Sequence, residues 1–278
     1  MRAALLLQCA DRPGIVAAVG AFVADQGGNV VEADQHSDPA AGLFLQRVEF
    51  DADASLEALH ARFSRVAERF TMEWSLHDLT ARPRVAVLAS RQGHCLADLL
   101  VRNALRELPG EIVLVASNHD THADLVDRFN VPFRHLPVGD DRDEQERALG
   151  ALLDATRPDV VVLARYMRVL PQWLVDAWQR RMINIHHSFL PSFAGARPYA
   201  QAHERGVKVI GATAHYVTPA LDEGPIIAQQ VLPVSHRDDP NRLERRGRDL
   251  EAVVLAEALR LHLEHRVIVY GRRTAVFD

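Results

Sequence analysis

The pattern of apolar and polar positions divides the chain into two stretches with different rhythms. Residues 1–80 contain short apolar runs separated by two segments whose apolar residues recur at helical spacing. The pattern predicts, in order, a strand, a helix, two strands, a helix and a strand at 3–9, 15–25, 29–36, 43–51, 55–70 and 72–76. This order, βαββαβ, is that of a ferredoxin-like domain.

A polar connector at 78–83 follows, and beyond it strands alternate with helices. The predicted elements are strands and helices in turn at 84–90, 94–107, 111–117, 121–129, 132–137, 140–156 and 159–164. After Asp159, the last of these is continuously apolar, as in a strand buried on both faces of a parallel sheet. The alternation predicts a doubly wound, mostly parallel α/β domain with a Rossmann-like sheet.

The remaining residues complete this second domain. They are predicted to form an arginine-rich polar segment at 236–248, a helix at 249–264 and a short strand at 267–270. The sequence therefore predicts an α/β protein of two domains, 1–80 and 84–278.

Composition narrows the class of protein. Hydrophobic residues make up 48% and charged residues 25%, with a net charge of −5, which is typical of a soluble globular protein without a broad basic surface for nucleic acid. The two cysteines, Cys9 and Cys95, lie far apart and form neither a disulfide framework nor a metal-spaced cluster. The apolar run that follows Arg2 is too short for a signal peptide, and no run reaches transmembrane length. We expect a cytoplasmic protein that binds neither nucleic acid nor membrane.

Candidate chemistry gathers at the end of a short apolar strand, 182–186. Asn184 and His186 are two residues apart, so their side chains leave the same face of the strand at its carboxyl end, where α/β sheets bind ligands. Asp222 lies in a turn between two further apolar strands. An amide, an imidazole and a carboxylate can together polarise a carbonyl and activate a nucleophile. We predict these three as catalytic residues; the alternative is a capped strand end and a turn aspartate without chemistry.

The motifs around these residues resemble the folate-dependent formyltransferase family. They are Asn-Ile-His at 184–186, Ser-x-Leu-Pro-x-Phe-x-Gly at 188–195, His-Tyr-Val-Thr at 215–218 and Leu-Asp-x-Gly-Pro-Ile-Ile at 221–227. The family's catalytic Asn, His and Asp match Asn184, His186 and Asp222. His187 stands where formyl-transferring members usually carry proline, and segment 90–99 lacks their glycine-rich phosphate loop. The resemblance therefore implies that water accepts the formyl group: 10-formyltetrahydrofolate would be hydrolysed to tetrahydrofolate and formate, without a metal or cofactor. The implied role is to balance one-carbon folate pools and to supply formate for purine synthesis.

The resemblance also implies the residues that bind the folate substrate. The predicted substrate-binding residues are Tyr166, Met167, Arg168, Val169, Leu170, His187 and His215. A pterin ring needs a flat apolar slot with a few backbone hydrogen bonds, which the segment 166–170 offers. The plainer interpretations are a helix start with an exposed arginine, a loop histidine and a hydrogen-bonded core histidine.

The first predicted turn, Asp11-Arg12-Pro13-Gly14, resembles that of an ACT domain. This resemblance implies an amino-acid effector near Asp11, Arg12 and Gly14, and a homo-oligomer, either dimer or tetramer. The alternative is a packing module in which Gly14 opens the helix and Asp11 caps it. Two other functions stay open: formyl transfer to an amine such as glycinamide ribonucleotide, and an amino-acid sensor with an inactive folate site.

Overall fold

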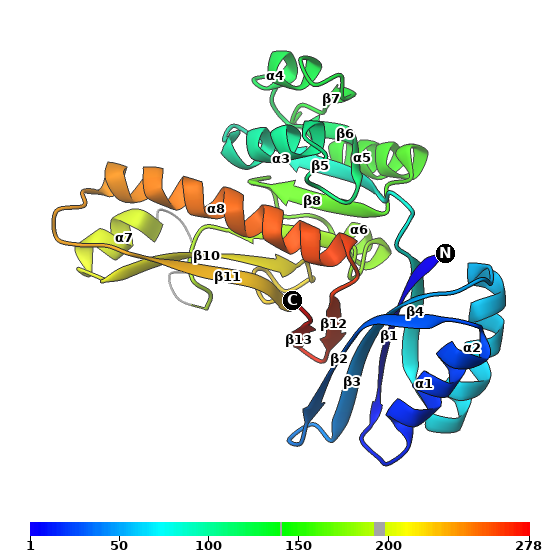
Figure 1. Ribbon diagram of the computed structural model, residues 1–278. Coiled ribbons are helices and arrows are strands. Elements are labelled where there is room, and N and C mark those ends of the chain that lie inside the picture. Colours follow the sequence, from blue (N-terminus) through cyan, green and yellow to red (C-terminus); the bar gives the residue numbers. More distant parts are fainter. Residues whose placement is uncertain (140, 192–197) are drawn as a thin grey trace. The chain divides into compact units, whose positions relative to one another are not determined.

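The computed structural model describes residues 1–139, 141–191 and 198–278. It divides into two compact units (Figure 1): Met1–Arg82 with Glu264–Asp278, and Pro83–Leu263. Across the described ranges, no helix combines the length and the apolar character needed to cross a membrane. The expected division, 1–80 and 84–278, differs from this one at its C-terminal end, because 264–278 pack within the first unit.

The first unit contains a four-stranded sheet in the order β2-β3-β1-β4, with every neighbouring pair antiparallel. Helices α1 and α2 lie on one face of this sheet (Figure 1). The elements are β1 Arg2–Ala10, α1 Ile15–Asp25, β2 Asn29–Asp38, β3 Leu43–Asp51, α2 Leu56–Phe70 and β4 Glu73–Asp78. The predicted βαββαβ arrangement is confirmed.

The two faces of β1 are buried against different partners. Leu5 and Leu7 pack toward α1 and α2, where Phe63 belongs to the same core. Leu6 points to the opposite face and packs with Ile268 and other residues of a C-terminal hairpin. The hairpin consists of β12 Val267–Tyr270 and β13 Arg273–Val276, of which only the first strand was predicted. Burial on both faces explains why the centre of β1, residues 3–7, is continuously apolar rather than alternating.

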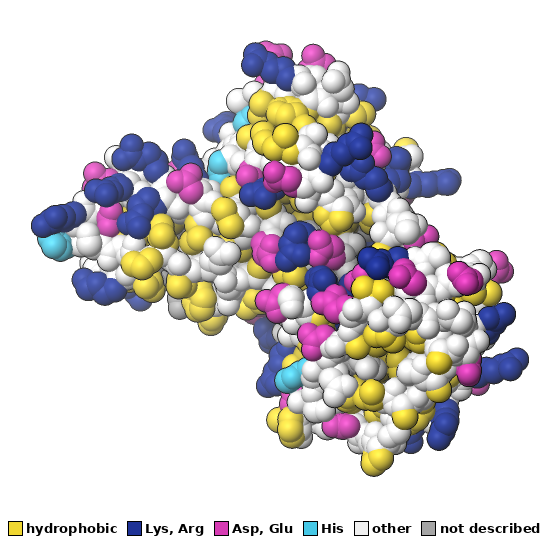
Figure 2. Space-filling model, in the orientation of Figure 1, with side chains coloured by type: hydrophobic (Ala, Val, Ile, Leu, Met, Phe, Trp, Pro, Cys, Tyr) yellow, Lys and Arg dark blue, Asp and Glu magenta, His cyan; other side chains and the backbone are white. Residues whose placement is uncertain are grey.

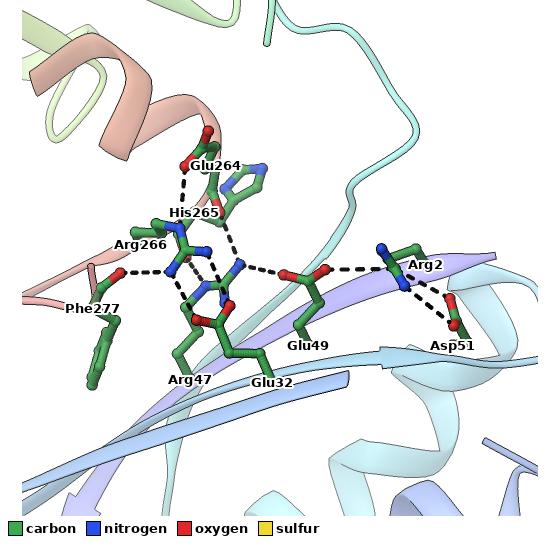
Figure 3. Close-up of polar contacts among 9 residues, drawn as sticks. All are labelled: Arg2, Glu32, Arg47, Glu49, Asp51, Glu264, His265, Arg266 and Phe277. Carbon is green, nitrogen blue, oxygen red and sulfur yellow. Dashed lines mark hydrogen bonds and ion pairs between the residues drawn. The ribbon is translucent and has the colours of Figure 1, made fainter. Parts of the chain in front are cut away.

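An ion cluster around one buried arginine ties the start of this hairpin to the sheet (Figure 3). Arg47 on β3 is only 2% exposed and pairs with Glu32 at 2.9 Å and with Glu49 at 3.0 Å. Its Nε donates to the backbone carbonyl of His265 at 3.0 Å. Arg266 pairs with the same Glu32 carboxylate at 2.9 Å. We call these five residues the Arg47 cluster; it joins segments that lie more than 200 positions apart in the chain.

The second unit is built on a seven-stranded sheet in the order β11-β10-β9-β8-β5-β6-β7. The pairs from β9 to β7 are parallel, whereas β10 and β11 pair antiparallel, so the predicted mostly parallel sheet is confirmed. The strands are β5 Arg84–Ala89, β6 Glu111–Ser117, β7 Phe133–His135, β8 Val160–Ala164, β9 Met182–His186, β10 Val209–Tyr216 and β11 Ile226–Pro233. The helices are α3 His94–Ala104, α4 Ala123–Asp127, α5 Arg142–Thr156, α6 Gln172–Ala177, α7 Pro198–Glu204 and α8 Pro240–Leu263.

Two predictions fall partly outside the described residues. The predicted helix 140–156 begins at a residue that is not described, and the observed helix runs over Arg142–Thr156. The motif Ser-x-Leu-Pro-x-Phe-x-Gly at 188–195 is described only as far as Pro191.

The arginine-rich segment 236–248 was predicted as a polar segment before a helix at 249–264, but most of it forms the first half of α8. The helix begins after Asp239, whose carboxylate accepts a hydrogen bond from the Arg242 N–H at 2.7 Å. Figure 2 shows basic side chains gathered around the start of α8, at the left of the view. The prediction was wrong because the arginines obscure the helical periodicity of the buried positions of α8, which begin at Leu243.

Candidate active site

A cavity of about 640 Å³ lies at the carboxyl edge of the second unit's sheet. The residues that follow β5, β8 and β9 line it, together with the β10–β11 turn and the first half of α8. Its volume is suited to a ligand of the size of a pterin. The predicted catalytic and substrate-binding residues all line this cavity: Asn184, His186, Asp222, Tyr166, Met167, Arg168, Val169, Leu170, His187 and His215.

Asn184 and His215 face each other across the antiparallel pair β9–β10. Nδ2 of Asn184 lies 3.2 Å from Nε2 of His215. The Nδ1–H of His215 donates to the backbone carbonyl of Tyr216 at 2.9 Å, which fixes the ring and directs Nε2 into the site. The register of these two strands therefore places the imidazole beside the amide, so the interpretation of His215 as a site residue fits better than that of an isolated core histidine.

His186 pairs with Asp222, with Nδ1 3.2 Å from the carboxylate Oδ2. Asp222 Oδ1 also lies 3.8 Å from Nε2 of His215. The hydrogen bond from His186, followed by the interaction with His215, holds the pKa of Asp222 well below its usual range. The carboxylate is therefore ionised throughout the neutral pH range.

The β10–β11 turn that carries Asp222 has an unusual backbone. Asp222 adopts a left-handed conformation with φ of 56°, which costs a non-glycine residue about 1 kcal/mol. Gly224 packs so closely against Tyr216 that an added Cβ would lie 1.6 Å from its carbonyl oxygen. This strained backbone lies where the turn places the Asp222 carboxylate beside the His186 imidazole. Backbone strain at such a place is typical of a functional site.

The other ring nitrogen of His186, Nε2, is buried and has no hydrogen-bond partner among the described residues. Nδ1 of His187 is in the same situation. Burial lowers the pKa of His187 to about 4, so its ring is neutral at neutral pH. A buried polar atom without a partner costs about 1–3 kcal/mol, so these two nitrogens indicate where a ligand forms hydrogen bonds.

Apolar side chains line the cavity from two directions. Met167 and Val169, after β8, are 62% and 57% exposed, and Leu221, in the β10–β11 turn, is 66% exposed. Exposed large apolar residues that line one cavity indicate a binding surface. Tyr166 is buried beside them, and burial raises the pKa of its hydroxyl. These residues provide the apolar slot that a flat ring requires.

Several polar residues of the cavity were not predicted from the sequence. They are Gln92, Arg165, Tyr199, Glu244, Arg248 and Glu251. Glu251 had a recognisable signal, because it shares the apolar stripe of a predicted helix with Val254 and Leu255. An acidic residue on such a stripe is seldom fully buried unless it is paired.

The three predicted effector-binding residues lie in the first unit, in the turn between β1 and α1. Gly14 has φ of 96° and precedes the helix, and no side chain caps the helix at this position. Arg12 donates to the Arg69 carbonyl at 2.7 Å, and its guanidinium lies 4.8 Å from the Phe70 ring. Asp11 is exposed. Arg12 is therefore bound to the end of α2, and the effector role of this turn stays a prediction.

Comparison with known families agrees with this fold and site. Residues 83–259 match the family model "Formyl transferase", and residues 3–63 match the ACT domain. The first unit is thus an ACT domain, and the second is an α/β domain of the formyl transferase class.

Relatives that share both domains narrow the class further. The chain is 49% identical over 281 residues to a formyltetrahydrofolate deformylase of Synechocystis sp., covering 100% of this chain and 99% of the relative. The crystal structure of a formyltetrahydrofolate deformylase from Pseudomonas syringae pv. tomato matches with a TM-score of 0.97 at 47% identity, covering 100% of this chain and 95% of that one. Glycinamide ribonucleotide transformylase 1 from Symbiobacterium toebii matches at 36% identity with a TM-score of 0.68, covering 71% of this chain and 95% of that one. The chain belongs to the formyltetrahydrofolate deformylase family.

Proposed function

We propose that this protein hydrolyses 10-formyltetrahydrofolate to tetrahydrofolate and formate. The observation that carries the proposal is the buried Nε2 of His186, which lacks a partner among the described residues and lies in a cavity with apolar walls. The attacking water has the O–H donor that this nitrogen, as a proton acceptor, needs. The deformylases that the chain matches over its full length support the same reaction.

Each of the three catalytic residues has its own role in the proposed reaction. Water attacks the formyl carbon while the His186–Asp222 pair takes one of its protons, and Asn184 donates through Nδ2 to the oxyanion that develops. The bond between the formyl carbon and N10 of the folate then breaks, and N10 receives a proton from the same pair. Asp222, ionised and bonded to Nδ1, orients the ring so that Nε2 points at the reacting atoms, as a carboxylate does in other histidine-based sites.

The alternative with the same site is transfer of the formyl group to an amine. The amine and the water would attack the same carbon, so the catalytic residues alone do not separate the two reactions. The match to deformylases spans both units, whereas the match to a glycinamide ribonucleotide transformylase covers 71% of the chain. Water is therefore the better-supported acceptor.

Formate release separates the two reactions. We expect purified protein to convert 10-formyltetrahydrofolate to equal amounts of tetrahydrofolate and formate when no amine is present. Product that forms only after glycinamide ribonucleotide is added would establish the transferase. Binding of the folate without any product would instead favour a sensor with an inactive site.

We further infer that the ACT domain regulates the enzyme through an amino acid and supports a homo-oligomer. Strand β2 is at the edge of its sheet and pairs with β3 on one side, so its other side is open to a second chain. Sedimentation of a dimer or tetramer, and a change of turnover when single amino acids are added, are the expected results. A monomer whose rate is the same with all twenty amino acids would contradict both.

A further inference from the structure

The cavity contains a second group of buried polar residues that the proposed reaction does not use. Glu251 on α8 is 1% exposed, and its two carboxylate oxygens are occupied. Oε1 accepts a hydrogen bond from the Tyr199 hydroxyl at 2.6 Å, and Oε2 lies 2.8 Å from Nε2 of His94 and 3.3 Å from Nε of Arg165. The same Nε of Arg165 donates to Gln92 at 2.9 Å. We call Gln92, His94, Arg165, Tyr199 and Glu251 the Glu251 cluster.

The backbone is adapted to this cluster at two positions. Gly247, one helical turn before Glu251, leaves the space that the phenol occupies, since an added Cβ would lie 2.0 Å from the Tyr199 hydroxyl. Arg165 adopts a left-handed conformation with φ of 61°, directly after β8 ends. Constraints of this kind persist where the surrounding structure requires a particular placement of side chains.

A metal site is the first function to test for this cluster, because His94, Cys95 and Glu251 have ligand atoms within 4.8 Å of one another. Two observations oppose it. The Arg165 cation lies 3.3 Å from the carboxylate oxygen that would bind the metal. Burial also raises the pKa of the Cys95 thiol well above its ordinary value, so it is not the thiolate that a metal requires.

The order of the strands places the cluster beside the catalytic residues. Asn184 and His186 are on β9, and Arg165 and Gln92 follow β8 and β5, the next two strands along the sheet. His187 connects the two groups, because its ring centroid lies 5.0 Å from that of His186 and 6.3 Å from that of Tyr199. The cluster therefore borders the part of the cavity beside His186 and His187, where the proposed mechanism has the water attack.

The side chains of the Glu251 cluster determine which formyl acceptor fits in the adjoining part of the cavity. Both oxygens of Glu251 are already bonded, so the carboxylate has little capacity to bind the polar groups of an amine substrate. The Tyr199 ring fills space beside His187, whereas the exposed apolar side chains of Met167, Val169 and Leu221 line the cavity after β8 and in the β10–β11 turn. Water is small enough to enter without contacts to these side chains.

We propose that the Glu251 cluster, with Tyr199 as its space-filling member, excludes amines from the acceptor side of the cavity and so restricts the formyl acceptor to water. This proposal rests on the proposed hydrolysis. Tyr199 is then a specificity-determining residue, and Glu251 is a positioning residue that acts through it.

The test is the partition of the formyl group between water and an amine. Wild-type protein, Tyr199→Ala and Tyr199→Phe are incubated with 10-formyltetrahydrofolate and saturating glycinamide, and formate and formylated glycinamide are measured in the same reaction. The ratio of the two products does not depend on the fraction of folded protein. We expect Tyr199→Ala to raise the amine-to-water ratio at least about tenfold, the scale of one altered pocket contact. Tyr199→Phe keeps the ring but loses the hydrogen bond to Glu251, so we expect it to raise the ratio less than Tyr199→Ala does.

A second variant tests the positioning of Tyr199 and also covers a failure of Tyr199→Ala to fold. Glu251→Gln keeps the size of the side chain but replaces the charged acceptor of the Tyr199 hydroxyl, and we expect it to raise the ratio for glycinamide about as much as Tyr199→Phe does. Folded variants that still release formate with unchanged ratios for glycinamide would overturn the proposal. Absence of formate from wild-type protein would instead overturn the proposed function.

Discussion

The two units each bury a charged network, and the two networks differ in how completely their polar atoms are bonded. In the first unit, the Arg47 guanidinium uses all three of its nitrogens: two on the carboxylates of Glu32 and Glu49 and one on a backbone carbonyl. In the second unit, the His186–Asp222 pair leaves Nε2 of His186 buried without a partner among the described residues.

This difference separates a structural role from a chemical one. A buried charge that is fully hydrogen-bonded joins parts of the fold, and nothing is left over for a ligand. A buried pair with one unbonded nitrogen facing a cavity keeps binding capacity for a substrate. Burial of charge alone therefore does not identify a site; incomplete bonding beside a cavity does.

The largest expected effect is on catalysis in the second unit. Asp222→Asn removes the charge that pairs with Nδ1 of His186, and we expect turnover to fall about a hundredfold or more, the scale of a lost acid–base group. Formate release at saturating substrate measures it. Glu223→Gln makes the same charge change one residue along, outside the residues that line the cavity, and serves as the control. An Asp222→Asn rate equal to that of the control would remove Asp222 from the mechanism.

The next effect is on stability in the first unit. Arg47→Met leaves Glu32 and Glu49 without their buried partner, and we expect the free energy of unfolding to fall by about 3 kcal/mol. Hydrogen exchange measured by mass spectrometry locates the loss, which should be concentrated in 29–51 and 264–278. If Arg47→Met exchanges like wild-type protein in those segments, the Arg47 cluster contributes little to the stability of the first unit.

A buried histidine in each unit gives a pH-dependent comparison. Burial lowers the pKa of both His77 and His187 to about 4, below the value of about 6.5 in the unfolded chain. Between these values the unfolded state binds a proton that the folded state does not, so stability falls as the pH falls from 6.5 toward 4. Each residue contributes up to about 3 kcal/mol of this loss.

Single substitutions test how much each unit contributes to the loss of stability at low pH. His77→Gln and His187→Gln cannot titrate, so each should flatten the pH dependence of unfolding between pH 6.5 and 4 for its own unit. Trp74 fluorescence reports on the first unit, and Trp173 and Trp178 report on the second. Equal pH slopes in both variants and wild type would show that other groups cause the acid loss.

The smallest effect is expected at an exposed ion pair of the first unit. Arg2 is 46% exposed and lies 3.3 Å from Asp51 and 3.5 Å from Glu49. Arg2→Met should change the free energy of unfolding by less than about 1 kcal/mol, because exposed pairs are screened by solvent. Denaturant titration beside Arg47→Met measures both. A loss as large as that of Arg47→Met would mean that burial does not distinguish the two arginines.

Much of the fold and of the site could be predicted from local patterns. Apolar periodicity located the strands of both sheets and most of the helices, because each element buries one face or both, but it did not locate the short helices α6 and α7. The convergence of Asn184, His186 and Asp222 on one cavity was predictable, because the first two share a strand face and the third lies in the turn that follows the next strand. Their catalytic role stays a prediction.

The parts that were missed depend on contacts between distant segments. Alternation along β3 assigns Arg47 to the face away from α1 and α2, and only the hairpin at the C-terminal end buries it there. Tyr199 and Glu251 meet across 52 positions, and the space for their contact comes from Gly247. No periodicity in one segment predicts such pairs.

One measurement tests the central claim, that the His186–Asp222 cavity hydrolyses the formyl group, most directly. Purified protein is incubated with 10-formyltetrahydrofolate in H₂¹⁸O without any amine, and formate is analysed by mass spectrometry. We expect each formate to carry one labelled oxygen, in an amount equal to tetrahydrofolate, and this product to be lost in Asp222→Asn. Unlabelled formate, or bound substrate without product, would contradict the account.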